Sequence, residues 1–121
     1  MTDAAREEQE LIARGVSLFN EAQFFEAHEV WEEIWRPATG ERRQTIQGLI
    51  QLASAYVHVQ RGTFSGGVRL FDKAFSRLDV EAARLLHVEI ADALTLAREH
   101  RERIAAGGEI EPREYPRLGY N

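Results

Sequence analysis

The chain has 121 residues, which fits a single domain, and it contains no cysteine, which excludes disulfides, thiolate nucleophiles and thiolate metal ligands. Twenty acidic against 15 basic residues give a net charge of −5, which disfavours a nucleic-acid partner because phosphate binding normally shows as a basic excess. No apolar run approaches the ~20 residues that span a bilayer, and the acidic N-terminal segment lacks a signal-peptide core. We therefore expect a soluble, cytoplasmic protein with no membrane partner.

The helical spacing of the apolar residues predicts an all-α protein of about five helices arranged in antiparallel hairpins. The first helix is expected over residues 3–20, where Thr2 or Asp3 can cap its N-terminus. The second is expected over residues 24–36, because Pro37 cannot continue a helix and disfavours helical geometry in the residue before it.

The third predicted helix covers residues 41–61 and ends at Gly62, a natural left-handed cap. A fourth helix begins near Phe64. The fifth is expected as one continuous helix from Asp79, which can cap it, to Ala106.

These elements predict one helical bundle domain over residues 1–108 and an extended tail over residues 109–121, lying on the body or on a partner. A shift of 40 positions aligns Phe24 with Phe64 and both tryptophans of the second helix with phenylalanines of the fourth. The shift indicates two similar hairpins, weakly like tetratricopeptide repeats. A chance likeness between two amphipathic helices is the alternative.

The second helix carries the most informative pattern. At about 100° per residue, His28 lies in the middle of an aromatic face, with Glu32 one turn later and Trp31 and Trp35 nearby. A carboxylate on a face that meets the core must find a partner or take up a proton. His28 is the nearest partner for Glu32.

Three interpretations of this pair remain open. The pair is a satisfied polar contact inside the bundle, or it lines a cleft that binds a small ligand or peptide. In the third interpretation it belongs to a metal centre, because His28-Glu29-x-x-Glu32 is a relative of the zinc-protease pattern with Glu29 in the general-base position.

A narrow polar stripe follows the third helix, which is otherwise apolar in nearly every direction. Gln47, Gln51, Ser54 and His58 lie at i, i+4, i+7 and i+11, within about 60° of one another. The stripe is either the solvent-facing strip of this helix or one side of a cleft. Short connections make the second and third helices neighbours, which favours the cleft.

The predicted cleft contains His28, Glu32, Gln47, Gln51, Ser54 and His58, with walls formed by Trp31, Trp35 and Tyr56. The leading functional hypothesis is a non-catalytic binding or assembly module that takes a small ligand, a peptide or a second copy of itself. The alternative is a metal-dependent hydrolase in which His28, Glu32 and His58 hold a divalent metal. The first hypothesis needs no cofactor, and no catalytic residue is assigned.

Two motifs together resemble the domain-of-unknown-function family 309. They are Phe24-Phe25-Glu26-Ala27-His28-Glu29 with Trp31-Glu32 and Trp35, and Gln47-Gly48-Leu49-Ile50-Gln51-Leu52-Ala53 followed by His58, Gly62 and Gly67. The resemblance covers roughly Leu11 to Leu78. It implies a small all-helical bundle, found chiefly in prokaryotes, with no assigned activity, and it supplies no catalytic residues.

Overall fold

The computed structural model describes residues 2–121. Over these residues the chain forms six α-helices, which are α1 (Asp3–Asn20), α2 (Phe24–Trp35), α3 (Gly40–Arg61), α4 (Phe64–Arg77), α5 (Val80–Arg84) and α6 (Ala91–Ala105). Two short strands, β1 (Val88–Glu89) and β2 (Gly119–Tyr120), pair antiparallel, and a 3-10 turn spans Pro112–Glu114. The all-α class is confirmed, and the first three helices lie within one residue of their predicted bounds.

The predicted helix ends rest on the expected capping contacts. Thr2 caps α1, because its hydroxyl oxygen accepts a hydrogen bond from the Ala5 amide at 3.0 Å. Gly62 ends α3 in the left-handed region at φ 74°. Within residues 2–121, no helix is long and apolar enough to cross a bilayer.

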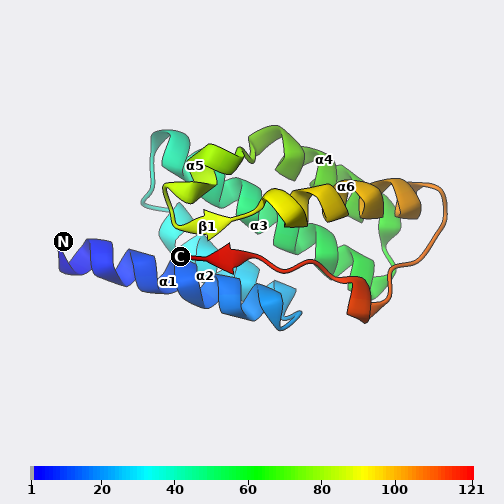
Figure 1. Ribbon diagram of the computed structural model, residues 1–121, viewed down its shortest axis with the longest axis horizontal. Helices are drawn as coiled ribbons and strands as arrows, with labels where there is room; N and C mark the ends of the chain where they lie inside the picture. Colours follow the sequence, from blue (N-terminus) through cyan, green and yellow to red (C-terminus); the bar gives the residue numbers. More distant parts are fainter. Residues whose placement is uncertain (1) are drawn as a thin grey trace.

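Helix α3 lies at the centre of the arrangement (Figure 1). It packs against α2 on one side and α4 on the other, while α1 packs against α2 and α6 packs against α4. The chain therefore forms two packed helix pairs, α1–α2 and α3–α4. The last residues return between α6 and α1, where β2 meets β1 (Figure 1).

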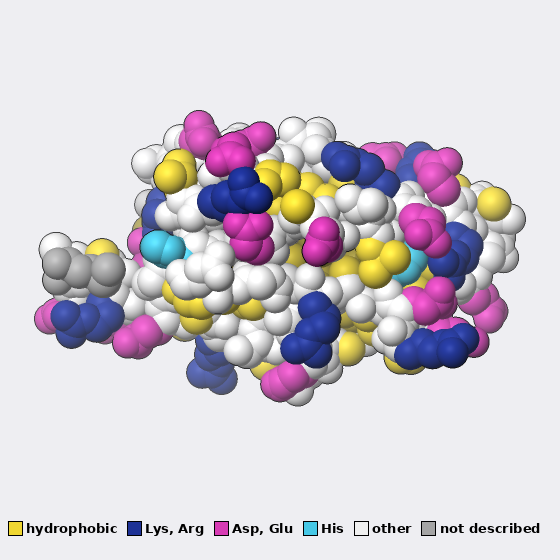
Figure 2. All heavy atoms as spheres, viewed as in Figure 1, with side chains coloured by type: hydrophobic (Ala, Val, Ile, Leu, Met, Phe, Trp, Pro, Cys, Tyr) yellow, Lys and Arg dark blue, Asp and Glu magenta, His cyan; other side chains and the backbone are white. Residues whose placement is uncertain are grey.

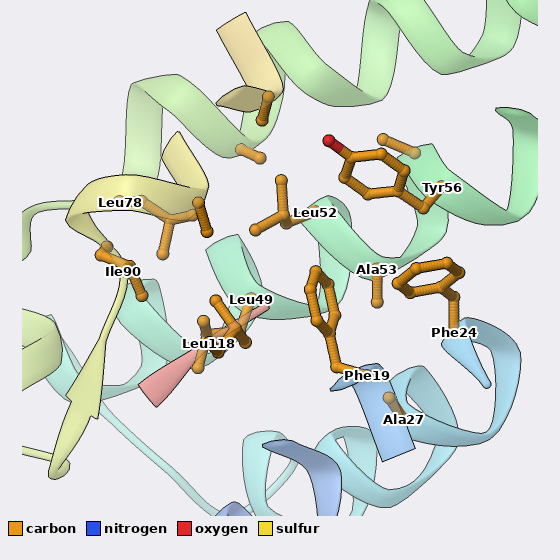
Figure 3. Packing of buried hydrophobic residues seen from close by; sticks show 14 of the residues in the cluster. Phe19, Phe24, Ala27, Leu49, Leu52, Ala53, Tyr56, Leu78, Ile90 and Leu118 are labelled. Atoms are coloured by element: carbon orange, nitrogen blue, oxygen red, sulfur yellow. The ribbon is translucent and has the colours of Figure 1, made fainter. Parts of the chain in front are cut away.

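The core forms where aromatic residues of α1 and α2 meet α3. Figure 3 shows Phe19 and Phe24 pointing toward Ala53 and Tyr56. The Phe19 and Phe24 rings meet edge to face at 4.9 Å between centroids, and the Phe24 and Tyr56 rings stack at 5.2 Å. All four residues are buried, so this end of the bundle is closed by aromatic packing.

The predicted fifth helix is wrong as a single element. Asp79 does cap a helix, accepting a hydrogen bond from the Ala82 amide at 2.9 Å, but α5 ends after five residues. His87 then adopts a positive φ of 66°, and β1 follows. The segment 86–90 alternates buried with less buried side chains, which is a strand period, although its apolar residues also fit a helical stripe.

The C-terminal tail packs on the body of the protein. Ile110 and Leu118 are buried within the main hydrophobic cluster. The Tyr115 ring meets the Phe24 ring edge to face at 5.4 Å. Asn20 on α1 holds the tail through two hydrogen bonds, donating to the Leu118 carbonyl and accepting from the Leu118 amide.

A buried polar pair joins α3 to α6. The Tyr56 hydroxyl lies 2.8 Å from His100 Nδ1, and both side chains are fully buried. Burial, with a smaller effect from the nearby Arg103 guanidinium, lowers the pKa of His100 below its ordinary value. Burial also raises the pKa of Tyr56, so both groups stay neutral and the hydrogen bond joins uncharged partners.

This pair predicts a loss of stability in mild acid. Below pH ~6.5 the unfolded chain protonates His100 while the folded chain resists the proton, so the free energy of unfolding falls as the pH drops. NMR titration should give His100 a pKa below ~6.5. Urea unfolding of the His100→Gln variant should show a smaller loss of stability than the wild type between pH 7 and pH 5.

The pH window separates this effect from that of the carboxylates. Hydrogen bonds with the Glu111 amide and Arg103 lower the pKa of Glu114. The contribution of Glu114 to the free energy of unfolding is therefore lost only below pH ~4.5. A His100 resonance that titrates above pH 6.5 would contradict the prediction.

Close packing between α1 and α2 depends on Gly15. A Cβ atom at Gly15 would lie 2.0 Å from Trp31 Nε1, inside the indole ring. Trp31 is fully buried and donates a long hydrogen bond, 3.3 Å, to the Ile12 carbonyl. Gly15→Ala should therefore lower the free energy of unfolding by about 1–3 kcal/mol in urea denaturation.

Gly67→Ala is the matched control. It lies in α4, where a Cβ atom would meet the Ile104 methyl at 3.3 Å. That methyl is the end of a flexible side chain, and alanine favours a helix over glycine by ~1 kcal/mol. We expect the free energy of unfolding of the control to lie within about 1 kcal/mol of the wild-type value. Equal decreases in the free energy of unfolding for the two variants would refute the role assigned to Gly15.

Candidate functional site

The predicted pair forms on α2. His28 Nε2 lies 2.6 Å from Glu32 Oε1, and His28 Nδ1 lies 3.3 Å from the Phe25 carbonyl oxygen. Both ring nitrogens thus lie beside oxygen atoms of α2. The side chains remain 24% and 30% exposed, so the pair lies at the edge of the bundle rather than inside it.

An open groove of about 230 Å³ runs between α2, α3 and α4 beside this pair. Its lining residues are His28, Glu32, Trp35, Gln47, Ile50, Gln51, Ser54 and Leu70. Six of the nine residues named from the sequence therefore come together. The amide stripe of α3 forms the floor between the two flanking helices, while Ile50, Leu70 and the Trp35 ring supply apolar surface.

Trp31 and Tyr56 do not line this groove, although the sequence analysis placed them in its walls. Trp31 faces α1, where it packs on Gly15. Tyr56 lies five residues after Gln51, which is about 140° away on a helix, and its ring enters the core. Both aromatic residues belong to the packing of the bundle.

His58 also lies outside the groove lining. It follows the stripe of α3 by one further turn, where its Nδ1 atom lies 2.6 Å from the Thr63 hydroxyl oxygen. A Cβ atom on Gly66 would approach the His58 ring to 2.7 Å. The imidazole is therefore held in the tight connection between α3 and α4 and closes that hairpin.

The three-ligand metal set is not formed. Throughout residues 2–121, no three histidine, aspartate or glutamate side chains lie close enough to hold a metal ion. His28 and Glu32 form a pair, but His58 is held by Thr63 and Gly66. The side-chain geometry therefore does not bring His28, Glu32 and His58 together as the metal centre expected for a hydrolase.

Ser54 shares the groove with the pair but is not placed as an activated nucleophile. Such a serine needs a histidine nitrogen as base, with the other nitrogen oriented by a third group. In His28 one nitrogen faces Glu32 and the other faces the carbonyl of its own helix. The geometry therefore does not place Ser54 as the nucleophile of an acyl transfer.

Four further residues, absent from the predicted cleft, shape the groove. Ile50 and Leu70 add apolar lining, and Arg77 Nη1 donates a long hydrogen bond of 3.5 Å to Gln51 Oε1. At the other end the Arg43 guanidinium lies 4.0 Å above the Trp35 ring, a cation–π contact. The sequence did not show which side of α4 would face the stripe of α3.

The comparisons with known proteins agree with this architecture. The family model described as "Domain of unknown function (DUF309)" matches residues 12–70. The crystal structure of the conserved hypothetical protein TTHA0068 from Thermus thermophilus is 32% identical, with a TM-score of 0.65. The match covers 74% of this chain and 94% of that one. No curated protein matches the chain.

The chain therefore belongs to the DUF309 family, as its helix motifs suggested. The matched region contains α2, α3 and the first half of α4, and with them every lining residue of the groove. The family description assigns no activity, so the function has to be argued from the groove itself.

The His28–Glu32 pair should contribute little to stability. Exposed pairs at this helical spacing are worth about 0.3–0.5 kcal/mol. We expect Glu32→Gln to lower the free energy of unfolding by less than about 1 kcal/mol in urea denaturation. Trp31→Ala, a change on the buried side of the same helix, should cost about 3–5 kcal/mol; similar losses would instead make the pair a structural element of the bundle.

Proposed function

We propose that the chain is a non-catalytic binding module that uses the groove between α2, α3 and α4 to dock a protein partner. The observation that carries the proposal is the uncovered stripe of Gln47, Gln51 and Ser54 on a helix that is otherwise buried nearly all round. Their side chains offer donors and acceptors, and the fold itself employs them little.

Two features favour a protein over a small metabolite. Small-molecule sites are concave pockets of about 300–1,000 Å³ that bury most of the ligand, whereas this groove is open and about 230 Å³. Its Trp35 ring, its aliphatic Ile50 and Leu70 side chains and its amides, with the His28–Glu32 pair at the border, resemble a protein interface, which combines an aromatic-enriched centre with a polar rim.

The charge of the chain and the apolar surface of the groove also bear on the partner. The excess of acidic residues supports a protein partner rather than nucleic acid, and we place this binding in the cytoplasm. A few desolvated side chains at the centre of an interface, tryptophan prominent among them, carry most of its binding energy, and Trp35 and Leu70 supply apolar surface to this groove. Leu70 and Trp35 are therefore the groove residues whose loss should matter most to a partner.

Site-specific photo-crosslinking in cells that produce the protein tests this function. A photoreactive amino acid replaces Gln47 in the groove or, as a control, Thr95 on the exposed side of α6. We expect a discrete adduct from position 47, identified by mass spectrometry as one defined protein. The same probe at position 95 should not yield that adduct.

A second pair of variants links the adduct to the groove. Leu70→Glu places a charge against the apolar anchor and should abolish the adduct. Leu85→Glu introduces the same charge at a leucine that is 76% exposed away from the groove, and it should leave the adduct intact. Adducts common to both probe positions, or adducts that survive Leu70→Glu in a folded protein, would overturn the proposal.

A further inference from the structure

The two helices that border the groove carry opposite charge. Helix α2 contains four glutamates and no Lys or Arg, and its charge is offset in part by Arg36 just beyond its end. Helix α4 contains Arg69, Lys73 and Arg77 with a single acid, Asp72. That acid is already paired with Arg101 of α6.

This segregation does not occur over the opposite face of the molecule. Figure 2 shows the face formed by α1, α6 and the tail, where acidic and basic side chains are interspersed. By contrast, Glu29, Glu33, Arg69 and Lys73 are exposed, and none of them forms an ion pair within residues 2–121. Their charges remain available to a partner.

We propose that the partner docked on the groove is a second copy of this chain, related by a twofold axis that runs along α3, so that α2 of each copy lies over α4 of the other. This inference rests on the proposed function, because it names the partner of the same groove. A twofold interface brings a surface against itself and requires its two halves to be complementary. An acidic half and a basic half on either side of α3 meet that requirement.

The charges also select the direction of the axis. A twofold axis across α3 would place α2 over α2 and α4 over α4, and would bring like charges together, which is strongly unfavourable. An axis along α3 instead places the acidic helix over the basic one at both edges. The floor is compatible with this axis, because the amide and hydroxyl groups of Gln47, Gln51 and Ser54 each donate and accept and so can face their own copies.

The register of the two helices fits the same symmetry. Rotation about an axis along α3 leaves the position of every residue along that axis unchanged. Gln60 at the end of α3 donates a 3.0 Å hydrogen bond to the Ala22 carbonyl just before α2, and α4 begins three residues after α3 ends. Both helices therefore start at the same end of α3.

The internal repeat then pairs the charges. Because Phe24 and Phe64 both begin their helices, residues 40 positions apart lie at similar heights. Glu29 of one copy therefore lies at the same position along the axis as Arg69 of the second, and Glu33 at the same position as Lys73. The exposed Phe25 ring, at 44%, adds apolar surface on the same side of α2 as Glu29.

Charge reversal with rescue tests the dimer. Size-exclusion chromatography with light scattering at tens of micromolar should give the mass of a dimer for the wild type. The Glu29→Arg/Glu33→Lys variant places basic residues at the paired positions of both borders, and the Arg69→Glu/Lys73→Glu variant places acidic residues at all of them. Each should run as a monomer, with the dimer weakened by at least about a hundredfold.

Mixing the two variants should restore a dimer, because each border then again faces the opposite charge. The control variant, Glu7→Arg/Glu10→Lys, makes the same charge change on exposed residues of α1 and should stay dimeric. Every variant should remain folded, because none of the four border residues forms an ion pair within residues 2–121. Circular dichroism checks this expectation.

The outcomes separate this inference from the proposed function. A monomeric wild type, or reversal variants that remain dimeric, would overturn the twofold dimer. If the position-47 probe then captures one defined protein other than this chain, the groove still docks a protein and only the identity of the partner is wrong. A monomeric wild type with no groove-specific adduct would overturn both proposals.

Discussion

Tyr56 is fully buried on α3, and aromatic rings from five other parts of the chain surround it. They are Phe19 of α1, Phe24 of α2, Phe71 of α4, His100 of α6 and Tyr115 of the tail. Ring pairs of this kind add to the free energy gained by burial. This one contact region therefore fixes the rotation of α3 about its own axis relative to its neighbours. The hydroxyl group would be costly to bury alone, and His100 supplies its partner. The bundle therefore closes around a polar pair whose burial disfavours the charged form of each partner.

The fixed rotation of α3 decides where its polar stripe points. Gln51 lies about 140° around the helix from Tyr56, so the side chains that enter the core and those that enter the groove lie on nearly opposite sides. Helices α2 and α4 pack on the two flanks between them, which leaves the stripe as the floor of a groove. The His28–Glu32 pair borders that groove with both imidazole nitrogens engaged. The same packing that makes the bundle stable thus leaves an open groove on one side of α3.

The charge of the flanking helices follows from the same arrangement. Helices α2 and α4 pack on either side of α3, and their exposed sides have opposite charge. Neither charge is needed to fold the chain, because buried apolar contacts hold both helices in place. Charges that are not used within a fold contribute mainly to the rate and specificity of association. The twofold dimer that we propose would give Glu29, Glu33, Arg69 and Lys73 partners that the single chain does not supply.

The sequence by itself determined the helical class, the bounds of the first helices and the grouping of His28 and Glu32 with the stripe of α3, because these depend on local periodicity and on caps such as Thr2 and Gly62. Only the tertiary structure decided which aromatic residues became core, since one helical pattern is compatible with several rotations toward a neighbour. Tertiary structure also divided the segment after Asp79 into α5, β1 and α6. Its apolar residues fit two periods, and pairing with the distant tail selected the strand.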